Sequence, residues 1–164
     1  MDLFVLRHGK AGEASEDGDD AMRELTARGR KEIRDIARWM RNEKFRFDAI
    51  ATSPLMRAHE TAGIIARILD RKDRLVVWEE LAPGGDIDTV CYHAAQLGNN
   101  KTVLVVGHEP GLSALLGRIT SRDGTTSVIM AKGSLARIRN FSFEGEPSGA
   151  LQWLLTAKQI QAML

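Results

Sequence analysis

The 164-residue chain has one cysteine, one tyrosine, only 5% aromatic residues and a net charge of just +1. The single cysteine, Cys91, excludes an intramolecular disulfide and fits a reducing compartment. No apolar run approaches the roughly 18 residues of a membrane-spanning helix. No basic segment, apolar run and small-residue cleavage site follow one another at the start of the chain. We therefore expect a cytoplasmic protein without a membrane partner.

Lysine and arginine (23) nearly balance aspartate and glutamate (22), so charge alone indicates no polyanionic partner. Basic residues do gather on one predicted helix, but no aromatic residues are interleaved with them, and we expect no nucleic-acid binding. We interpret them as a solvent-exposed helix face, with a surface for an acidic partner as the alternative. These residues are Arg28, Arg30, Lys31, Arg34, Arg38 and Arg41.

Segments of strand and helix character alternate along the chain. Strands are predicted at 3–6, 47–54, 74–78 and 101–107, and helices at 26–44, 54–70, 86–97 and 110–119. Thr26, Ser53 and Pro54 are expected to start helices, and the apolar segments 127–143 and 150–160 are predicted as late strands. This order predicts an α/β fold, a three-layer α/β/α sandwich with a mainly parallel mixed sheet. We expect a single domain over residues 1–164 without a large cap insertion, and therefore an open site.

Polar side chains stand where three of the predicted strands end. Arg7 and His8 follow the first strand, Arg57 lies one turn into the helix after the second, and His108 follows the strand "TVLVVG". Ligands of open α/β folds bind at the carboxyl ends of the strands, so these four residues are expected to meet at one edge of the sheet.

Two arginines and two histidines repel one another unless an anion is present, and arginine binds phosphoryl oxygens in a bidentate manner. A neutral imidazole is a nucleophile near neutral pH. The pattern therefore predicts His8 as a nucleophile towards phosphorus, with Arg7, Arg57 and His108 binding the phosphoryl group. Gly9 is expected to let the backbone pass close to the ligand or to adopt positive φ.

Each of these residues also has a purely structural interpretation. His8 could be a core histidine, Arg57 a surface arginine of a helix, and His108 a cap of the following helix. Ser53 is interpreted as a helix cap rather than a ligand. The four histidines lack close paired spacing, and the acidic stretch 13–20 is interpreted as a loop, so we expect no metal and no other cofactor.

Three segments, "LRHGKA", "SPLMRAHETA" and "VVGHEPGLS", resemble the signature segments of the histidine phosphatase superfamily, which has the phosphoglycerate mutase-like fold. The short length and the segments "ELTARGRKE" and "ELAPGGD" resemble its SixA-type phosphohistidine phosphatase branch. The resemblance implies that His8 is the phosphorylated residue and that Arg7, Arg57 and His108 form the phosphate pocket.

Superfamily members that act on alcohol phosphates use a glutamate or aspartate to protonate the leaving group. The resemblance implies Glu79 or Glu80 of "VWEELAPGGD" for this role. Glu80 stands nearest the SixA-like pattern, although that branch is thought not to depend on a strong acid. The expected substrate is a phosphohistidine on a partner protein. A small-molecule phosphomonoesterase and a non-catalytic phosphate-binding or interaction module remain the alternatives, and the oligomeric state is open.

Overall fold

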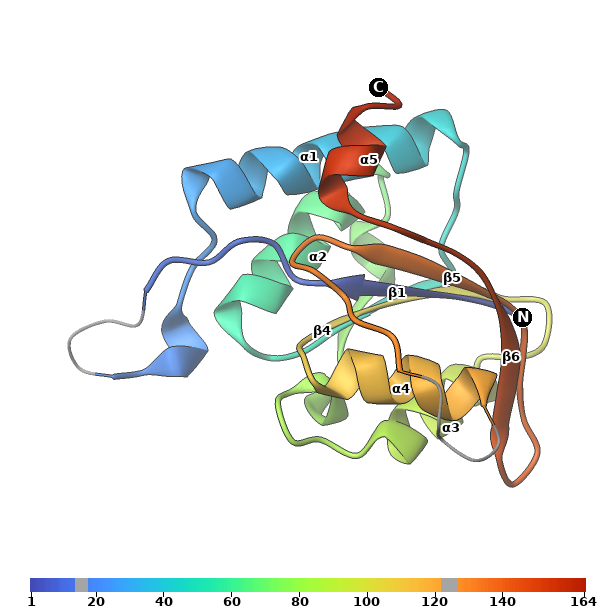
Figure 1. Cartoon of the computed structure of the whole chain (residues 1–164). Coiled ribbons are helices and arrows are strands. Elements are labelled where there is room, and N and C mark those ends of the chain that lie inside the picture. The colour runs from blue at the N-terminus through green and yellow to red at the C-terminus, as the bar shows by residue number, and fades with distance from the viewer. Residues whose placement is uncertain (14–17, 122–126) are drawn as a thin grey trace.

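The structure, a computed structural model, describes residues 1–13, 18–121 and 127–164, so part of the acidic stretch 13–20 lies outside the described residues. Within these residues one sheet has the strand order β3-β2-β4-β1-β5-β6 (Figure 1). Its strands are β1 (Asp2–Arg7), β2 (Ala49–Thr52), β3 (Leu75–Val77), β4 (Thr102–Gly107), β5 (Leu135–Phe143) and β6 (Pro147–Leu155). The helices are α1 (Ala27–Asn42), α2 (Met56–Ile68), α3 (Ile87–Gln96), α4 (Gly111–Thr120) and α5 (Ala157–Gln161), with 3-10 turns η1 (Asp20–Met22), η2 (Lys72–Arg74) and η3 (Glu79–Leu81).

Among the described strands, β5 alone runs against the direction of the others. β4 pairs in parallel with β1 and with β2, and β2 pairs in parallel with β3. β5 is antiparallel to β1, and β6 is antiparallel to β5. The predicted mainly parallel mixed sheet is confirmed, and the carboxyl ends of β1, β2, β3 and β4 share one edge.

Alternation along the central strands creates two cores, one on each face of the sheet. Phe4 and Leu6 of β1 belong to a cluster with residues of α1, α2 and α5. Leu3 and Val5, which point the other way, belong to a cluster with residues of α3 and α4. The predicted three-layer sandwich is therefore confirmed, and Figure 1 shows the sheet between these two groups of helices.

The start of α1 follows the sequence prediction. The Thr26 side chain accepts a hydrogen bond from the Gly29 amide at 2.9 Å and caps the helix. Ile33, Ile36 and Met40 repeat at helical spacing and are fully buried against the sheet. The helix ends two residues before the predicted Lys44, which takes a left-handed φ of 60° and turns the chain towards β2.

The predicted start of the second helix is wrong. Helix α2 begins at Met56 rather than at Pro54, and Leu55 occupies its N-cap position without a side-chain cap bond. Ser53 is therefore not the cap of α2.

At the other end of the chain, β6 stops at Leu155, and α5 follows where a strand was expected to continue to residue 160. The segment 127–134 also lies outside β5, which begins only at Leu135. No described helix is long and apolar enough to cross a bilayer.

Candidate active site

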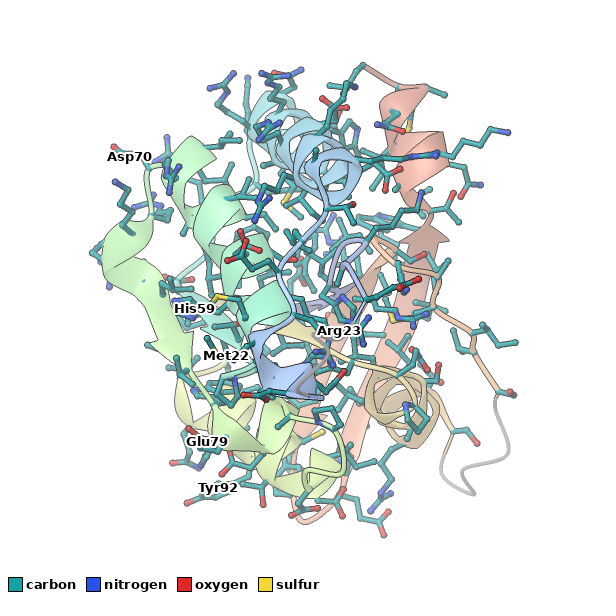
Figure 2. All side chains as sticks on the ribbon, turned by 90° about the vertical axis from the view of Figure 1, so that its left-hand side faces the viewer. Met22, Arg23, His59, Asp70, Glu79 and Tyr92 are labelled. Carbon is teal, nitrogen blue, oxygen red and sulfur yellow. The ribbon has the colours of Figure 1, made fainter. Side chains whose placement is uncertain are left out.

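A cavity of about 220 Å³ lies at the carboxyl edge of the sheet, and it contains all four residues that the strand-end pattern predicts. Figure 2 looks onto this edge and shows Arg23 near its centre. Three further charged side chains, which were not predicted from the sequence, lie in the cavity wall. The complete lining is Arg7, His8, Arg23, Arg57, Pro83, His108, Glu109 and Lys132.

His8 follows β1 and is only 5% exposed. Its Nδ1 lies 2.7 Å from the carbonyl oxygen of Gly9. A carbonyl oxygen can only accept, so Nδ1 carries the ring hydrogen in this contact. The lone pair of the neutral ring is then on Nε2, the nitrogen that is available for bonding to phosphorus.

The surroundings of His8 keep its imidazole neutral. Burial is the main cause that lowers the pKa of His8 from 6.5 to about 4, and the positive charges of Arg57, Arg7 and Lys132 lower it further. The hydrogen bond to Gly9 opposes this shift. At neutral pH the ring is therefore unprotonated and retains its nucleophilic lone pair.

His108 follows β4, and its ring lies 4.9 Å from the ring of His8, measured between centroids. Its Nε2 lies 2.8 Å from the Ser53 hydroxyl, which already accepts a hydrogen bond from the Leu55 amide. A hydroxyl can donate one hydrogen bond and accept two, so this contact is satisfied with the ring hydrogen on either nitrogen of His108. Nδ1 of His108 is buried and has no partner among the described residues.

Burial is also the main cause that lowers the pKa of His108, to about 3, followed by the charges of His8 and Arg57. Both imidazoles are thus neutral at pH 7, and the positive charge of the cavity comes from arginine and lysine.

Arg57 projects from the first turn of α2 and is 5% exposed. Its Nη1 donates to the Asp20 carbonyl oxygen at 2.7 Å, and its Nη2 donates to the Asp20 carboxylate at 2.9 Å. Arg23 donates to the same carboxylate at 2.7 Å. The hydrogen bond from Arg23, then the contact with Arg57, lowers the pKa of Asp20, so its carboxylate stays ionised and bridges two arginines of the cavity.

Arg7 is positioned by the chain that precedes β5. Its Nη1 donates to the Met130 carbonyl oxygen at 2.7 Å, whereas its Nε is buried without a partner among the described residues. The Gly133 amide lies 3.2 Å from the Arg7 carbonyl oxygen and 3.1 Å from that of His8. The same connection carries Lys132, so it brings a further cation to the cavity.

The predicted positive φ of Gly9 is wrong, and the predicted close passage of its backbone to a ligand stays a prediction. Gly9 is not among the described glycines with positive φ. A Cβ at this position would lie 2.8 Å from Cγ1 of Ile33, so the absence of a side chain lets the chain after His8 pass beneath α1. Packing of this segment against α1 is the reason for the glycine.

Glu80 lies apart from the other predicted residues. Its carboxylate is 3.7 Å from Nδ1 of His93, and it lines a separate cavity of about 20 Å³ that also touches His108. Glu79 stands in the same 3-10 turn, towards the margin of the face in Figure 2. The carboxylate that lines the larger cavity is Glu109, whose Oε1 is buried without a partner among the described residues.

Arg23, Glu109 and Lys132 were missed for different reasons. Glu109 stands next to His108 in the third signature segment, and that position was the available signal. Arg23 lies in a polar stretch without apolar rhythm, and Lys132 lies in a segment predicted as strand. Only the fold brings these two residues to the cavity.

Among the described residues, no group of three or more histidine, cysteine, aspartate or glutamate side chains is placed to hold a metal ion.

The model of the histidine phosphatase superfamily (branch 1) matches residues 3–82. An uncharacterized protein of a Picosynechococcus strain is 30% identical over 114 residues, which cover 68% of each chain. This chain belongs to the histidine phosphatase superfamily. The phosphohistidine phosphatase SixA of Escherichia coli is 27% identical over 158 residues, which cover 95% of this chain and 94% of that protein.

A solved structure of the protein histidine phosphatase SixA, complexed with tungstate, is also similar to this superfamily member. The two structures superpose with a TM-score of 0.86 at 27% sequence identity, over 96% of this chain and 98% of the other. The likeness therefore extends to both ends of the sheet, including β5 and β6, which lie beyond the residues that the family model matches.

Proposed function

We propose that this protein is a phosphatase that removes the phosphoryl group from a phosphohistidine on a partner protein, through a covalent phosphohistidine on His8. The neutral His8 imidazole carries the proposal: its Nδ1 is bound to the Gly9 carbonyl, its Nε2 lone pair is available, and it lines a cavity with Arg7, Arg57 and His108. A phosphate site that only bound its ligand would need the cations but not this nucleophile.

In the first step, Nε2 of His8 attacks phosphorus as the bond between phosphorus and the substrate nitrogen breaks. The substrate imidazole leaves and takes up a proton from water, which becomes hydroxide. In the second step, water attacks the phosphohistidine, the bond between phosphorus and Nε2 breaks, and inorganic phosphate leaves. The hydroxide from the first step takes up the proton that the attacking water loses. His8 is thereby regenerated with its proton still on Nδ1.

The other residues of the cavity act on charge and position. Arg7 and Arg57 neutralise the equatorial oxygens of the transferring group. We assign the ring hydrogen of His108 to its partnerless Nδ1, from which it donates to one of these oxygens. Arg23 and Lys132 add positive charge to the same wall. Hydrogen bonds hold Arg7, Arg23, Arg57 and His108 in place before the substrate arrives, so these groups need little reorganisation during transfer.

The relatives support the phosphoryl chemistry. SixA of Escherichia coli is named a phosphohistidine phosphatase, and the similar SixA structure holds tungstate. Tungstate is a tetrahedral oxyanion, as phosphate is. The compartment we propose remains the cytoplasm, on the basis of the single buried and unpaired Cys91.

A second candidate is a phosphomonoesterase acting on a small alcohol phosphate, and one observation favours it. An alkoxide leaving group needs a proton donor, and the partnerless Oε1 of Glu109 lies in the cavity wall. Glu80, which the family resemblance suggests for this role, lies 3.7 Å from Nδ1 of His93 and lines the other cavity. An imidazole leaving group depends less on such a donor.

The deciding experiment measures phosphate release from a phosphohistidine-bearing protein and from p-nitrophenyl phosphate, with His8→Ala as the control. A His8-dependent preference for phosphohistidine that survives both Glu109→Gln and Glu80→Gln is the expected result. A preference for the aryl phosphate that either substitution removes would establish the second candidate instead. Phosphate-dependent thermal stabilisation without turnover above His8→Ala would indicate a non-catalytic binding module.

A further inference from the structure

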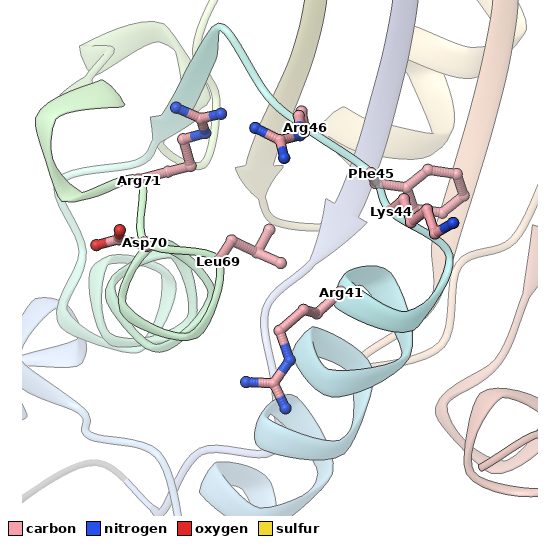
Figure 3. A pocket seen from close by; sticks show the side chains of 7 residues that line it. All are labelled: Arg41, Lys44, Phe45, Arg46, Leu69, Asp70 and Arg71. Atoms are coloured by element: carbon pink, nitrogen blue, oxygen red, sulfur yellow. The ribbon is translucent and has the colours of Figure 1, made fainter.

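A second and larger cavity, of about 330 Å³, lies between the ends of α1 and α2, far from the catalytic cavity along β2. Its walls come from the end of α1, the connection from α1 to β2 and the turn after α2 (Figure 3). Arg46 stands three residues before the start of β2, whereas Ser53 of the active site follows its end. The seven lining residues are Arg41, Lys44, Phe45, Arg46, Leu69, Asp70 and Arg71.

The charge of this cavity is unbalanced. It has four cationic side chains and a single carboxylate, Asp70. Among the described residues, no carboxylate lies within 4.0 Å of any of the four cations. Like charges held together in this way favour binding of an anion.

Most of the other basic residues of α1 are different, because they are neutralised within the fold. Arg28 contacts Glu32 at 3.1 Å, and Arg30 contacts Glu60 at 2.8 Å. Lys31 and Arg38 both contact Asp35. The interpretation of this helix face as a solvated exterior fits these paired residues, whereas Arg41 belongs to the unpaired group around the cavity.

The helix ends do not account for the unpaired cations. Basic side chains near a helix C-terminus can bind its last carbonyl groups, but backbone amides already do so here. In α1, the Met40 carbonyl accepts from the Phe45 amide and the Arg41 carbonyl accepts from the Lys44 amide. In α2, the Ala66 carbonyl accepts from the Arg71 amide at 2.7 Å. The guanidinium groups of Arg41 and Arg71 thus remain available for a ligand.

The arrangement of the arginines indicates the kind of anion. Figure 3 shows Arg46 and Arg71 on one side of Leu69 and Arg41 on the other, so the positive groups surround an apolar centre. The ring of Phe45 packs against the rings of Trp39 and Trp153, whose centroids lie 5.6 Å and 6.4 Å from its own. Cations on both sides of Leu69 suit an extended anion, and a chain of linked phosphates offers oxygens along a greater length than a single phosphate does.

We propose that this cavity is a binding site for an anion with two or three linked phosphate groups, either inorganic or part of a nucleotide. Its volume is within the range of small-molecule sites, and guanidinium groups are well suited to phosphate oxygens. The site is separate from the catalytic cavity, and its existence does not depend on the proposed reaction.

The test is isothermal titration calorimetry of the full chain with pyrophosphate, ADP and ATP, at about 150 mM salt so that diffuse attraction is screened. His8→Ala serves as the background because it prevents turnover. In this background the double variant Arg46→Ala/Arg71→Ala removes two of the four cations of the second cavity, and Arg7→Ala removes one cation of the catalytic cavity. Arg34→Ala is the matched control, because Arg34 is exposed on α1 and also has no carboxylate partner among the described residues.

The expected result is a binding event that Arg46→Ala/Arg71→Ala weakens about tenfold or more, as the loss of charge-assisted hydrogen bonds predicts. Arg34→Ala and Arg7→Ala should change it less than about twofold. Equal affinity for pyrophosphate and ATP would assign the site to the phosphate chain alone, and tighter binding of ATP would assign it to a nucleotide. Absence of the event, its loss in Arg7→Ala, or an equal loss in Arg34→Ala would overturn the proposal.

Discussion

Both terminal nitrogens of Arg57 are hydrogen-bonded to Asp20, at 2.7 Å to its carbonyl oxygen and at 2.9 Å to its carboxylate. The two residues are 37 positions apart in the chain. The Arg57 side chain is 6% exposed whereas that of Asp20 is 53% exposed, so an accessible carboxylate fixes a buried guanidinium. The contact orients Arg57 without withdrawing the whole group, since a guanidinium has five hydrogens to donate.

Asp20→Ala should lower kcat/KM for the preferred substrate by about tenfold, because charge-assisted hydrogen bonds contribute roughly 1.5–3 kcal/mol. Asp20→Asn retains an acceptor oxygen and should lose less. Steady-state kinetics of both variants provides the measurement. A rise in kcat/KM for Asp20→Ala would show instead that Asp20 competes with the phosphoryl group for Arg57.

The activity should depend on pH as a buried, neutral His8 dictates. The reactive ring is the unprotonated form, and its pKa is lowered to about 4. From pH 7.5 to 5.5, the protonation of His8 should therefore change kcat/KM little, whereas a histidine with the ordinary pKa of about 6.5 would lose about tenfold. A pH–rate profile tests this, with circular dichroism at each pH to verify folding. A tenfold decline centred near pH 6.5 would contradict the assignment.

The same shift predicts how stability depends on pH. The unfolded chain binds a proton at His8 near pH 6.5, whereas the folded chain does so only near pH 4. Between pH 4 and pH 6.5 the unfolded state holds more protons than the folded state, so the free energy of unfolding rises with pH in this range. The stability that the neutral His8 contributes is lost as the pH falls from 6.5 towards 4.

His8→Asn should flatten this slope by up to about 1.4 kcal/mol per pH unit, the value for one proton. Urea unfolding at several pH values between 5 and 7 measures the slope. His59→Asn, at an exposed position of α2, is the control. An unchanged slope in His8→Asn would mean that His8 does not titrate differently in the folded and unfolded states.

The sequence predicts the parts of the site that depend on local pattern. A buried strand followed by a polar residue fixes where Arg7, His8 and His108 lie, since the carboxyl ends of parallel strands share an edge. No such pattern connects Asp20 with Arg57, or Lys132 with His8, because those relations arise only when distant segments pack. Side-chain partners are equally non-local, which is why Ser53 was interpreted as a helix cap.

The end of the chain carries two sequence patterns that predict different structures. Apolar residues dominate 150–160, so the whole segment was predicted as a strand. Thr156 and Gln159, however, have the spacing of a capping box, and in the structure each side chain bonds to the backbone of the other. The capping box predicts the helix that the structure has here, whereas the apolar composition alone predicts a strand.

Ser53→Ala should impair both catalysis and stability. It removes the hydroxyl that contacts Nε2 of His108 at 2.8 Å and accepts from the Leu55 amide at 3.2 Å. Leaving buried polar groups without partners costs about 1–3 kcal/mol in the free energy of unfolding. Because the hydroxyl no longer supports the proposed tautomer of His108, with its proton on Nδ1, kcat/KM should fall about tenfold as one donor to the phosphoryl group is lost.

Thermal denaturation and kinetics of Ser53→Ala measure the two effects. Ser148→Ala is a suitable control, because its hydroxyl has an exposed hydrogen bond with Ser142 on the antiparallel strands. Full activity in Ser53→Ala would mean that His108 does not need the serine to orient its ring.

Two helical glycines should respond in opposite directions to the same substitution. A Cβ on Gly29 would meet the backbone of Lys10, two residues after His8, whereas a Cβ on Gly63 would meet nothing within 4 Å. Gly29→Ala should therefore lower the free energy of unfolding by about 1–3 kcal/mol through overpacking. Gly63→Ala should raise it by up to about 1 kcal/mol, because alanine favours the helical conformation.

Since the clash is with backbone that leads directly from His8, the proposed nucleophile, Gly29→Ala should also reduce kcat, while Gly63→Ala should leave it unchanged. Urea unfolding and steady-state kinetics on the two variants separate these effects. Equal stabilisation by both substitutions would show that the chain after His8 can move away from α1, and that its close packing does not hold His8 in place.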